Sequence, residues 1–289
     1  MNAPVVVAVD GSKDGRRALH FGIALATAYD APLRLVHVRH ENVLEAPMMP
    51  MFPDPLLKEV AVQVLHHALA DTQRMGWRGP TPETVLAWPP RVAALVDHTG
   101  DSRCVVLGSR SAPVQHLLTG STTNGVAAHS SVPVVCVPSG WDESAGLHRI
   151  AVGVECSEEA QPVIEGAVAL GHVLGAQVLV VHAWRPIGQY DAAIGGRAVA
   201  ERWAAASQPV LENLVEPVRA ASPDVKIVVE LRYERPVVAL HELSRAHDLL
   251  VIGRHGRHTR LSPRLGTTAR TVIRTSECPV VVVPAAQGD

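Results

Sequence analysis

Aromatic side chains are scarce in this sequence. Phe, Trp and Tyr make up 3% of the 289 residues, although hydrophobic residues as a whole make up 47%. A core of this composition is built mainly from Ala, Val and Leu, which favours the many small contacts that helices make with parallel strands in α/β proteins. Long apolar runs are also missing. No stretch reaches the roughly 18 residues that a membrane-spanning helix needs, so we expect no membrane partner.

A surplus of positive charge is lacking too. The formal net charge is −2, and only three residues are Lys. The chain therefore has no overall basic field that would attract nucleic acid or an anionic membrane surface. The N-terminal sequence MNAPVVVAVDGS has no basic segment followed by a long apolar run, which a signal peptide would need. We predict a cytoplasmic protein that binds no nucleic acid.

Patterns for disulfides, metals and catalysis are missing as well. The four cysteines are widely spaced without a CxxC pair, which favours reduced thiols in the core. His255 and His258 have no third ligand at a suitable spacing, so we expect no metal site. The sequence contains no GxxxxGK[ST] loop, no GxGxxG after a strand and no GxSxG elbow. No residue stands out as a catalytic base.

What the sequence does contain is an internal repeat. Sliding the chain by 145 residues, or by 146 at the end, superposes similar strand sequences. The matched pairs are 5–12 with 150–157, 33–38 with 178–183, 104–111 with 249–256, and 132–138 with 278–284. This register predicts a duplicated domain, with one copy in residues 1–138, a polar linker in 139–148 and a second copy in 149–289.

Each copy alternates apolar strands with amphipathic helices. In the first copy we expect strands near 4–9, 33–38, 83–88, 104–108 and 133–137, and helices near 13–29, 56–75, 90–98 and 121–129. In the second copy we expect strands near 149–154, 177–183, 225–231, 249–253 and 279–283, and helices near 158–174, 197–220, 235–246 and 266–275. The strands are continuous apolar runs, as expected when helices cover both faces. The predicted fold is α/β: two tandem doubly wound domains of Rossmann-like type, each a five-stranded parallel sheet flanked by helices.

The most informative loop follows the fourth strand of the second copy. Gly253 and Gly256 stand three residues apart, and after nine more residues Gly266-Thr267 opens a helix. Glycines let the backbone approach a phosphate closely, and a helix N-terminus offers free N–H groups and a positive dipole end to an anion. Arg and His residues crowd segment 254–264, which makes the loop locally basic. The pattern indicates an oligophosphate site.

This Gly-x2-Gly-x9-Gly-Ser/Thr pattern resembles that of the universal stress protein family. Asp10-Gly11-Ser12 after the first strand, His37-Val38 at the end of the second, and the Val-Pro-Val-rich strand that closes each copy agree with the family. The resemblance covers essentially the whole chain, twice, as in tandem members typical of actinobacteria.

The family's ATP-binding members imply roles by position. In the first copy Ala8 and Asp10 would flank the adenosine, and the backbone at Val38 would read the adenine edge. The ribose and phosphates would be held by Leu107, Gly108, Gly120, Ser121 and Thr122. The corresponding residues in the second copy, with Arg254 of the basic loop, are Gly153, Glu155, Ala183, Ile252, Gly253, Arg254, Gly256, Gly266, Thr267 and Thr268.

Neither copy keeps the whole family pattern. The first copy has Ser111 where the second glycine is expected, and its loop is one residue short. The second copy keeps the loop but has Glu155-Cys156 in place of Asp-Gly. We therefore expect the second copy to bind phosphates more tightly. We expect the first copy to offer the better binding surface for the nucleoside but to bind phosphates more weakly.

The resemblance implies an ATP-binding regulatory protein of the stress response. Phosphates themselves can recruit Mg²⁺, and slow ATP hydrolysis or autophosphorylation is the most that the sequence supports. The alternative is a nucleotide-free interaction module of the same fold, in which the hydrophobic edges at 132–138 and 278–284 pair and two chains form a homodimer. His37 and His182, at matching strand ends, are either packed scaffold residues or hydrogen-bonding groups that face the site.

Overall fold

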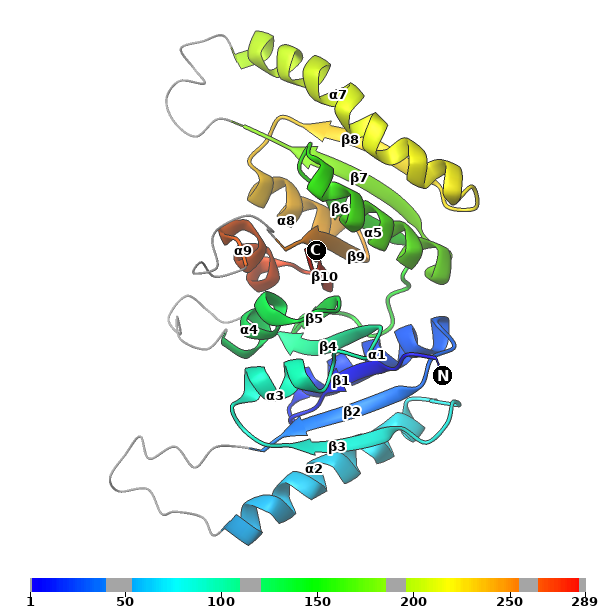
Figure 1. The fold of residues 1–289 in the computed structure, drawn as a ribbon, viewed down its shortest axis with the longest axis vertical. Coiled ribbons are helices and arrows are strands. Elements are labelled where there is room, and N and C mark those ends of the chain that lie inside the picture. Colours follow the sequence, from blue (N-terminus) through cyan, green and yellow to red (C-terminus); the bar gives the residue numbers. More distant parts are fainter. Residues whose placement is uncertain (1, 40–53, 110–120, 186–195, 255–264, 286–289) are drawn as a thin grey trace, which may run out of the picture. The chain divides into compact units, whose positions relative to one another are not determined.

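The computed structural model describes residues 2–39, 54–109, 121–185, 196–254 and 265–285. The chain folds as two compact units, residues 1–143 (unit 1) and residues 144–289 (unit 2). Each unit is a parallel sheet covered by helices on both faces (Figure 1).

Unit 1 contains five parallel strands in the order β3-β2-β1-β4-β5. They are β1 (Val5–Ala8), β2 (Leu33–Val38), β3 (Glu83–Ala87), β4 (Cys104–Ser109) and β5 (Val134–Pro138). The helices are α1 (Lys13–Ala28), α2 (Asp54–Arg74), α3 (Arg91–Asp97) and α4 (Ser121–His129). α1 and α2 pack together on one face of the sheet and α3 and α4 on the other, which explains why the central strands are apolar throughout.

Unit 2 repeats this topology with the order β10-β9-β6-β7-β8, again all parallel. Its strands are β6 (Arg149–Gly153), β7 (Gln177–Ala183), β8 (Ile227–Arg232), β9 (Leu249–Gly253) and β10 (Val280–Val283). Its helical elements are the short 3-10 turn η1 (Glu158–Ala160), α5 (Gln161–Leu174), α7 (Gly196–Ala221), α8 (Pro236–Ala246) and α9 (Thr267–Thr275). The predicted fold class, two doubly wound five-stranded domains in tandem, is confirmed.

The strand order places the first and fourth strands of each unit side by side. β1 pairs with both β2 and β4, and β6 pairs with both β7 and β9, so the chain reverses its direction of travel across the sheet there. In doubly wound sheets, ligands bind beyond the carboxyl ends of the strands at this switch point. The topology therefore puts the candidate site of unit 2 above β6 and β9.

The residues predicted as a linker begin inside the core of unit 1. Trp141 is only 7% exposed and packs edge-to-face on the buried ring of Phe21, with the ring centroids 5.2 Å apart. His20 lies beside the same indole. Segment 139–148 is thus anchored at its start by an aromatic contact to α1, which its polar composition did not indicate.

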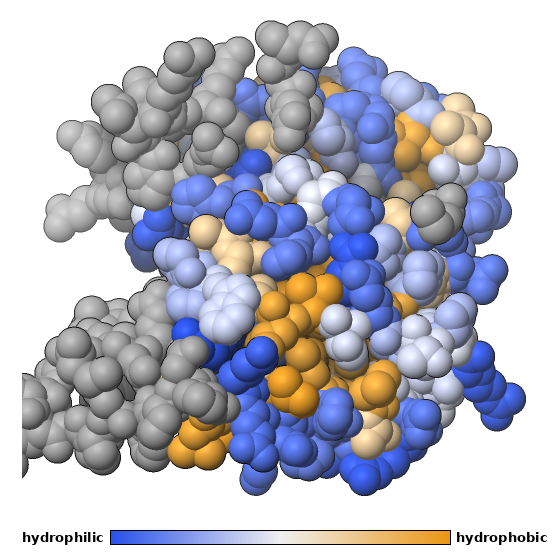
Figure 2. All heavy atoms as spheres, turned by 60° about the horizontal axis from the view of Figure 1, so that its bottom comes forward, coloured by the Kyte–Doolittle hydropathy of each residue, from blue (hydrophilic) through white to orange (hydrophobic). Residues whose placement is uncertain are grey.

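The outer helix α2 is amphipathic. Ala61, Leu65 and Ala68 are buried at helical spacing, while Leu56 and Val60 are 44% and 54% exposed. Figure 2 brings this end of unit 1 forward and shows hydrophobic residues gathered among hydrophilic ones. Single apolar residues on a surface are common, and the buried stripe is what fixes the helix on β2 and β3.

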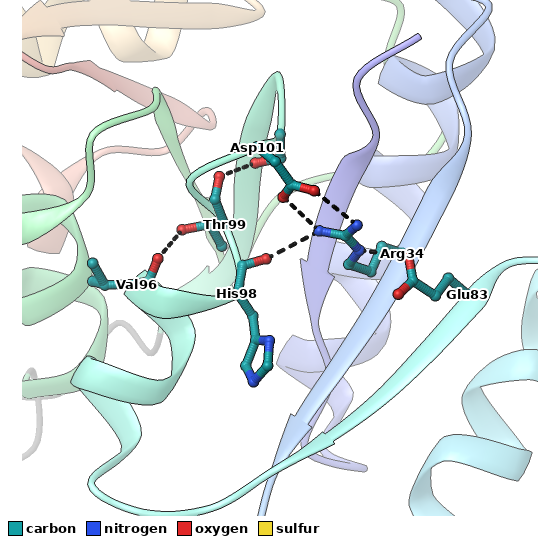
Figure 3. Close-up of polar contacts among 7 residues, drawn as sticks. Arg34, Glu83, Val96, His98, Thr99 and Asp101 are labelled. Carbon is teal, nitrogen blue, oxygen red and sulfur yellow. Dashed lines mark hydrogen bonds and ion pairs between the residues drawn. The ribbon is translucent and has the colours of Figure 1, made fainter. Parts of the chain in front are cut away.

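A polar network joins the amino ends of β2 and β3 to the turn before β4 (Figure 3). The Arg34 guanidinium donates a hydrogen bond of 2.7 Å from Nε to Glu83, its cross-strand neighbour, and two of 2.7 and 3.0 Å to the carboxylate of Asp101. Its Nη1 also donates to the His98 carbonyl at 3.3 Å. The hydrogen bonds from Arg34 lower the pKa of the Asp101 carboxyl.

Replacing Arg34 with Gln is expected to lower the free energy of unfolding by about 1 kcal/mol at pH 7. A bidentate pair formed by a half-buried guanidinium stabilises a protein by an amount at the upper end of the range for surface ion pairs. The folded-state pKa of Asp101 lies below its unfolded value near 3.9, so this contribution is present above that pH and is lost as the pH falls through the folded pKa. Urea titrations should show a difference at pH 7 that narrows below about pH 4.

Arg74→Gln is the matched control for Arg34→Gln. Arg74 pairs with Asp71 one turn earlier in α2 at 2.8 Å, but its side chain is 71% exposed. Its removal is expected to change stability by less than about 0.5 kcal/mol. Equal losses in the two variants, or a difference that persists unchanged in acid, would contradict a stabilising role for the Arg34 network.

Candidate functional site

A pocket of about 910 Å³ lies at the carboxyl ends of the strands of unit 2. Its walls come from the segments that follow β6, β7, β9 and β10, together with the first turns of α8 and α9. The volume falls within the range of about 300–1,000 Å³ that is typical of small-molecule sites. The pocket therefore occupies the place that the switch-point topology indicates.

The structure brings the predicted residues of the second copy together in this pocket. Those that line it are Gly153, Glu155, Ala183, Ile252, Gly253, Arg254, Gly266, Thr267 and Thr268. Gly256 lies outside the described residues, as do His255 and His258. These residues come from three strand ends and one helix start, so the family spacing selected residues that are neighbours in space.

One wall of the pocket is the N-terminus of α9. Gly266 is the N-cap residue, in an extended conformation with φ −66° and ψ 162°, and as a glycine it has no side chain with which to cap the helix. The backbone N–H groups of a first helical turn have no partners within the helix. Thr267 and Thr268 add two hydroxyl groups beside them. The arrangement presents hydrogen-bond donors and the positive end of a helix dipole to the cavity.

The charges around the pocket leave the start of α9 open to an anion. Glu158 and Glu159 lie in η1, just before α5, where carboxylates compensate that helix dipole. The first turn of α9 has no acidic residue, and Arg254 lines the pocket from the end of β9. The start of α9 therefore keeps an uncompensated positive dipole end, as does that of α8, whose first turn also has no acidic residue.

Two glycines on the pocket floor are needed for packing. A Cβ at Gly253 would lie 2.8 Å from Val163 of α5, and one at Gly153 would lie 2.4 Å from Leu240 of α8. A larger residue at either position would force the facing side chain, or the helix that carries it, to move. Gly253 is expected to contact the ribose and phosphates, and it also has a role in packing. Because it has no side chain, α5 can approach β9 closely.

Several lining residues were missed by the sequence analysis. Cys156, Pro236, Leu240 and Trp184 all line the pocket. Burial raises the pKa of the Cys156 thiol, so this cysteine is held in its protonated form at neutral pH. Trp184 had a readable signal, because it follows Ala183 directly in a chain with few aromatic residues.

The corresponding residues of unit 1 lie on adjacent strand ends. Ala8, Val38, Leu107 and Gly108 are at or near the carboxyl ends of β1, β2 and β4. Ser121 and Thr122 begin α4, and Gly120 and Ser111 lie outside the described residues. A Cβ at Gly108 would lie 2.5 Å from the backbone oxygen of Asp14, so this glycine allows close packing of α1.

The Asp10-Gly11-Ser12 turn caps α1. Oδ1 of Asp10 accepts hydrogen bonds from the backbone N–H of Ser12 at 2.9 Å and from its hydroxyl at 2.5 Å. Oγ of Ser12 in turn accepts from the N–H of Gly15 at 3.0 Å, as an N-cap residue does. Gly11 has φ +76°, a conformation that favours glycine. In unit 2 Glu155-Cys156 replaces this turn and leads into η1 instead.

The two strand-end histidines make the same contact in each unit. Nδ1 of His37 donates to the Val9 carbonyl at 2.7 Å, and Nδ1 of His182 donates to the Val154 carbonyl at 2.9 Å. His37 is buried, so it acts as a packed scaffold residue. His182 has the same scaffold bond and also lines the pocket. Of the two interpretations that the sequence left open, the packed scaffold residue applies to His37 in unit 1, and the group that faces the site applies to His182 in unit 2.

Within the described parts of the chain, no group of three or more His, Cys, Asp or Glu side chains is arranged to hold a metal ion. Nor does any helix in these parts have the length and apolar character needed to cross a bilayer.

Comparisons with known proteins agree with this architecture. The model of the universal stress protein family matches residues 1–138 and again residues 146–284. A universal stress protein of Mycolicibacterium smegmatis is 26% identical over 291 residues, and one of Mycobacterium tuberculosis is 26% identical over 294 residues; each alignment covers 96% of both chains. The crystal structure of a universal stress protein from Archaeoglobus fulgidus has the same fold, with a TM-score of 0.71 at 19% identity over 97% of this chain and 98% of that one. Because the family model matches twice and spans nearly the whole chain, this protein belongs to the universal stress protein family and carries its domain in two tandem copies.

Proposed function

We propose that this chain is a regulatory protein of the stress response that binds ATP in the pocket of unit 2. The observation that carries the proposal is the pocket itself, which joins an apolar strand-end region to the uncapped start of α9. A nucleotide needs both: a dry surface for its base and N–H donors with positive potential for its phosphates.

In the proposed pose the phosphates lie against Gly266, Thr267 and Thr268, which line the pocket at the start of α9. Arg254, from the end of β9, adds positive charge on the same side. The base lies toward Ala183 at the end of β7, where the resemblance to ATP-binding relatives puts the adenine edge. Mg²⁺ would enter with the phosphates, since the protein need only supply one or two ligands for that ion.

We assign a regulatory role because the described residues of the pocket offer binding groups and no pairing typical of a fast catalyst. Cys156 is a protonated thiol, and its Sγ contacts the carbonyl of Ser207, not a base. ATP bound to one conformation of the chain more tightly than to another shifts the population toward the first. Hydrolysis, if it occurs, would be slow and would not be needed for this effect.

Calorimetric titration with ATP and Mg²⁺ tests the proposal. We expect saturable heat with one strong site per chain, and adenine absorbance in nucleotide extracted from protein purified without added ATP. An absence of heat at millimolar ATP, together with nucleotide-free protein, would overturn the proposal and favour an interaction module of the same fold. Sedimentation of the same samples would test the predicted homodimer.

A further inference from the structure

Three of the few aromatic residues of the chain gather beside the pocket of unit 2. Trp184 follows β7 directly, Tyr233 follows β8 directly, and Trp203 comes from α7. The rings of Trp184 and Trp203 are stacked at an interplanar angle of 20° with centroids 5.8 Å apart. Tyr233 lies 5.9 Å from the first and 6.1 Å from the second. Aromatic rings at these separations attract one another, so the group forms a supported cluster.

Of the three residues in this cluster, Trp184 is the one that lines the pocket. It is 37% exposed, whereas Trp203 and Tyr233 are half-buried. His182, which also lines the pocket, lies 5.5 Å from Trp203. Contacts with two neighbouring rings restrict the rotamer of Trp184, so the pocket has a preformed aromatic wall at little entropic cost to a ligand.

The repeat shows that this wall is particular to unit 2. Val38 is paired with Ala87 across β2 and β3, and Ala183 is paired with Arg232 across β7 and β8, so the residues that follow each pair correspond. Trp184 therefore takes the place of Arg39, and Tyr233 the place of Trp88. In unit 1 the Arg39 guanidinium lies 4.2 Å from the centroid of the Trp88 ring. The first copy thus has a cation at the position where the second has an indole.

Resting on the proposed function, we infer that Trp184 is the surface on which the base of the bound nucleotide stacks, and that it makes the unit 2 pocket selective for purine nucleotides over phosphate compounds without a base. Stacking on an aromatic ring is favourable for every base and grows with the overlapping area, which is largest for purines. Trp184 is adjacent in sequence to Ala183, whose backbone would read the adenine edge. The pocket would therefore separate two tasks: recognition of the base at β7 and recognition of phosphates at α9.

The test compares ATP with inorganic triphosphate, which has the phosphates but no base. For Trp184→Ala we expect ATP binding about tenfold weaker than in the wild type, a change that corresponds to about 1.4 kcal/mol, and triphosphate binding that is unchanged. Trp184→Phe retains an aromatic face and should bind ATP within about threefold of the wild type. Titration of the wild type with ATP should also quench tryptophan emission, and Trp184→Phe should remove most of that quenching.

Trp88→Ala is the matched control, because it removes the exposed tryptophan at the end of the third strand of unit 1 and should leave both affinities unchanged. Equal ATP affinity in Trp184→Ala and the wild type would overturn the stacking role while leaving the proposed function intact. Parallel loss of ATP and triphosphate binding would also overturn it, since it would show that Trp184 only maintains the pocket's shape. No ATP binding to the wild type would remove the proposed function and this inference together.

Discussion

Replacing Gly266 with Asp is expected to weaken ATP binding by a hundredfold or more without destabilising the fold. The new carboxylate would stand at the N-cap of α9, where it accepts hydrogen bonds from the N–H groups that the phosphates are proposed to use. It would also repel the phosphates: two unit charges about 4 Å apart interact by about 4 kcal/mol at an effective dielectric constant of 20. A net loss of about 3 kcal/mol already corresponds to more than a hundredfold in Kd.

The stability of the Gly266→Asp variant should stay level or rise slightly. The backbone at Gly266 has φ −66° and ψ 162°, which any residue adopts, and Asp is a better N-cap than Gly by a few tenths of a kcal/mol. Thermal unfolding without ligand should therefore match the wild type while calorimetry with ATP shows the loss. A loss of ATP affinity without a loss of thermal stability would separate an effect on binding from damage to the fold.

Gly266→Asn is the control for charge at this position. Asn has nearly the shape of Asp and caps a helix equally well, but it brings no negative charge. We expect a loss of ATP affinity several-fold smaller than that of the Asp variant. If the Asp variant bound ATP as tightly as the wild type, the proposed position of the phosphates at α9 would be wrong.

The second large effect is expected from Trp141→Ala, which should lower the free energy of unfolding of unit 1 by about 3–5 kcal/mol. Trp141 is 7% exposed and meets Phe21 edge-to-face, so truncation removes buried apolar area, an aromatic pair and the packing around both. A loss of this size is a large part of the total stability of a typical domain. Faster amide hydrogen exchange in β1 and α1 would locate the effect.

Trp88→Ala again provides the comparison for Trp141→Ala. Trp88 is 49% exposed, so its truncation should cost less than about 1 kcal/mol although the same type of side chain is removed. The two variants differ in burial and not in residue type. If Trp141→Ala cost no more than the expected loss for Trp88→Ala, less than about 1 kcal/mol, segment 139–148 would not stabilise unit 1, contrary to the packing of Trp141 on Phe21.

The strands and helices could be predicted from short stretches of sequence, because the burial of each face sets the pattern of apolar residues along the element. Strands covered on both faces must be apolar throughout, as in β1 and β9, and they are readable without any tertiary information. The buried stripe of α1, which includes Ala18, Leu19 and Ile23, has the expected helical spacing. The duplication strengthens these predictions, because a similar strand sequence recurs at the corresponding position of the other copy.

Other features depended on contacts between distant segments. The role of Gly108 against Asp14, and that of Gly253 against Val163, comes from how closely a helix approaches a strand end. The distance from strand to helix is set by the packing of whole layers, and a lone glycine in a sequence does not report it. The glycine spacing was therefore interpreted through phosphate contact alone, although packing also requires these residues.

The sequence by itself determined that the chain is a duplicated, doubly wound α/β protein, and its resemblance to the family indicated part of the lining of the unit 2 pocket. The first conclusion depends on periodicity and repeats along the chain, and the second on the family pattern of glycines. Only the tertiary structure decided that Trp141 belongs to the core of unit 1 and that Trp184, Trp203 and Tyr233 form one cluster at the pocket. Those contacts join residues from 19 to 120 positions apart, and no local pattern encodes them, because sheet order and helix packing together fix which strand ends and helices meet.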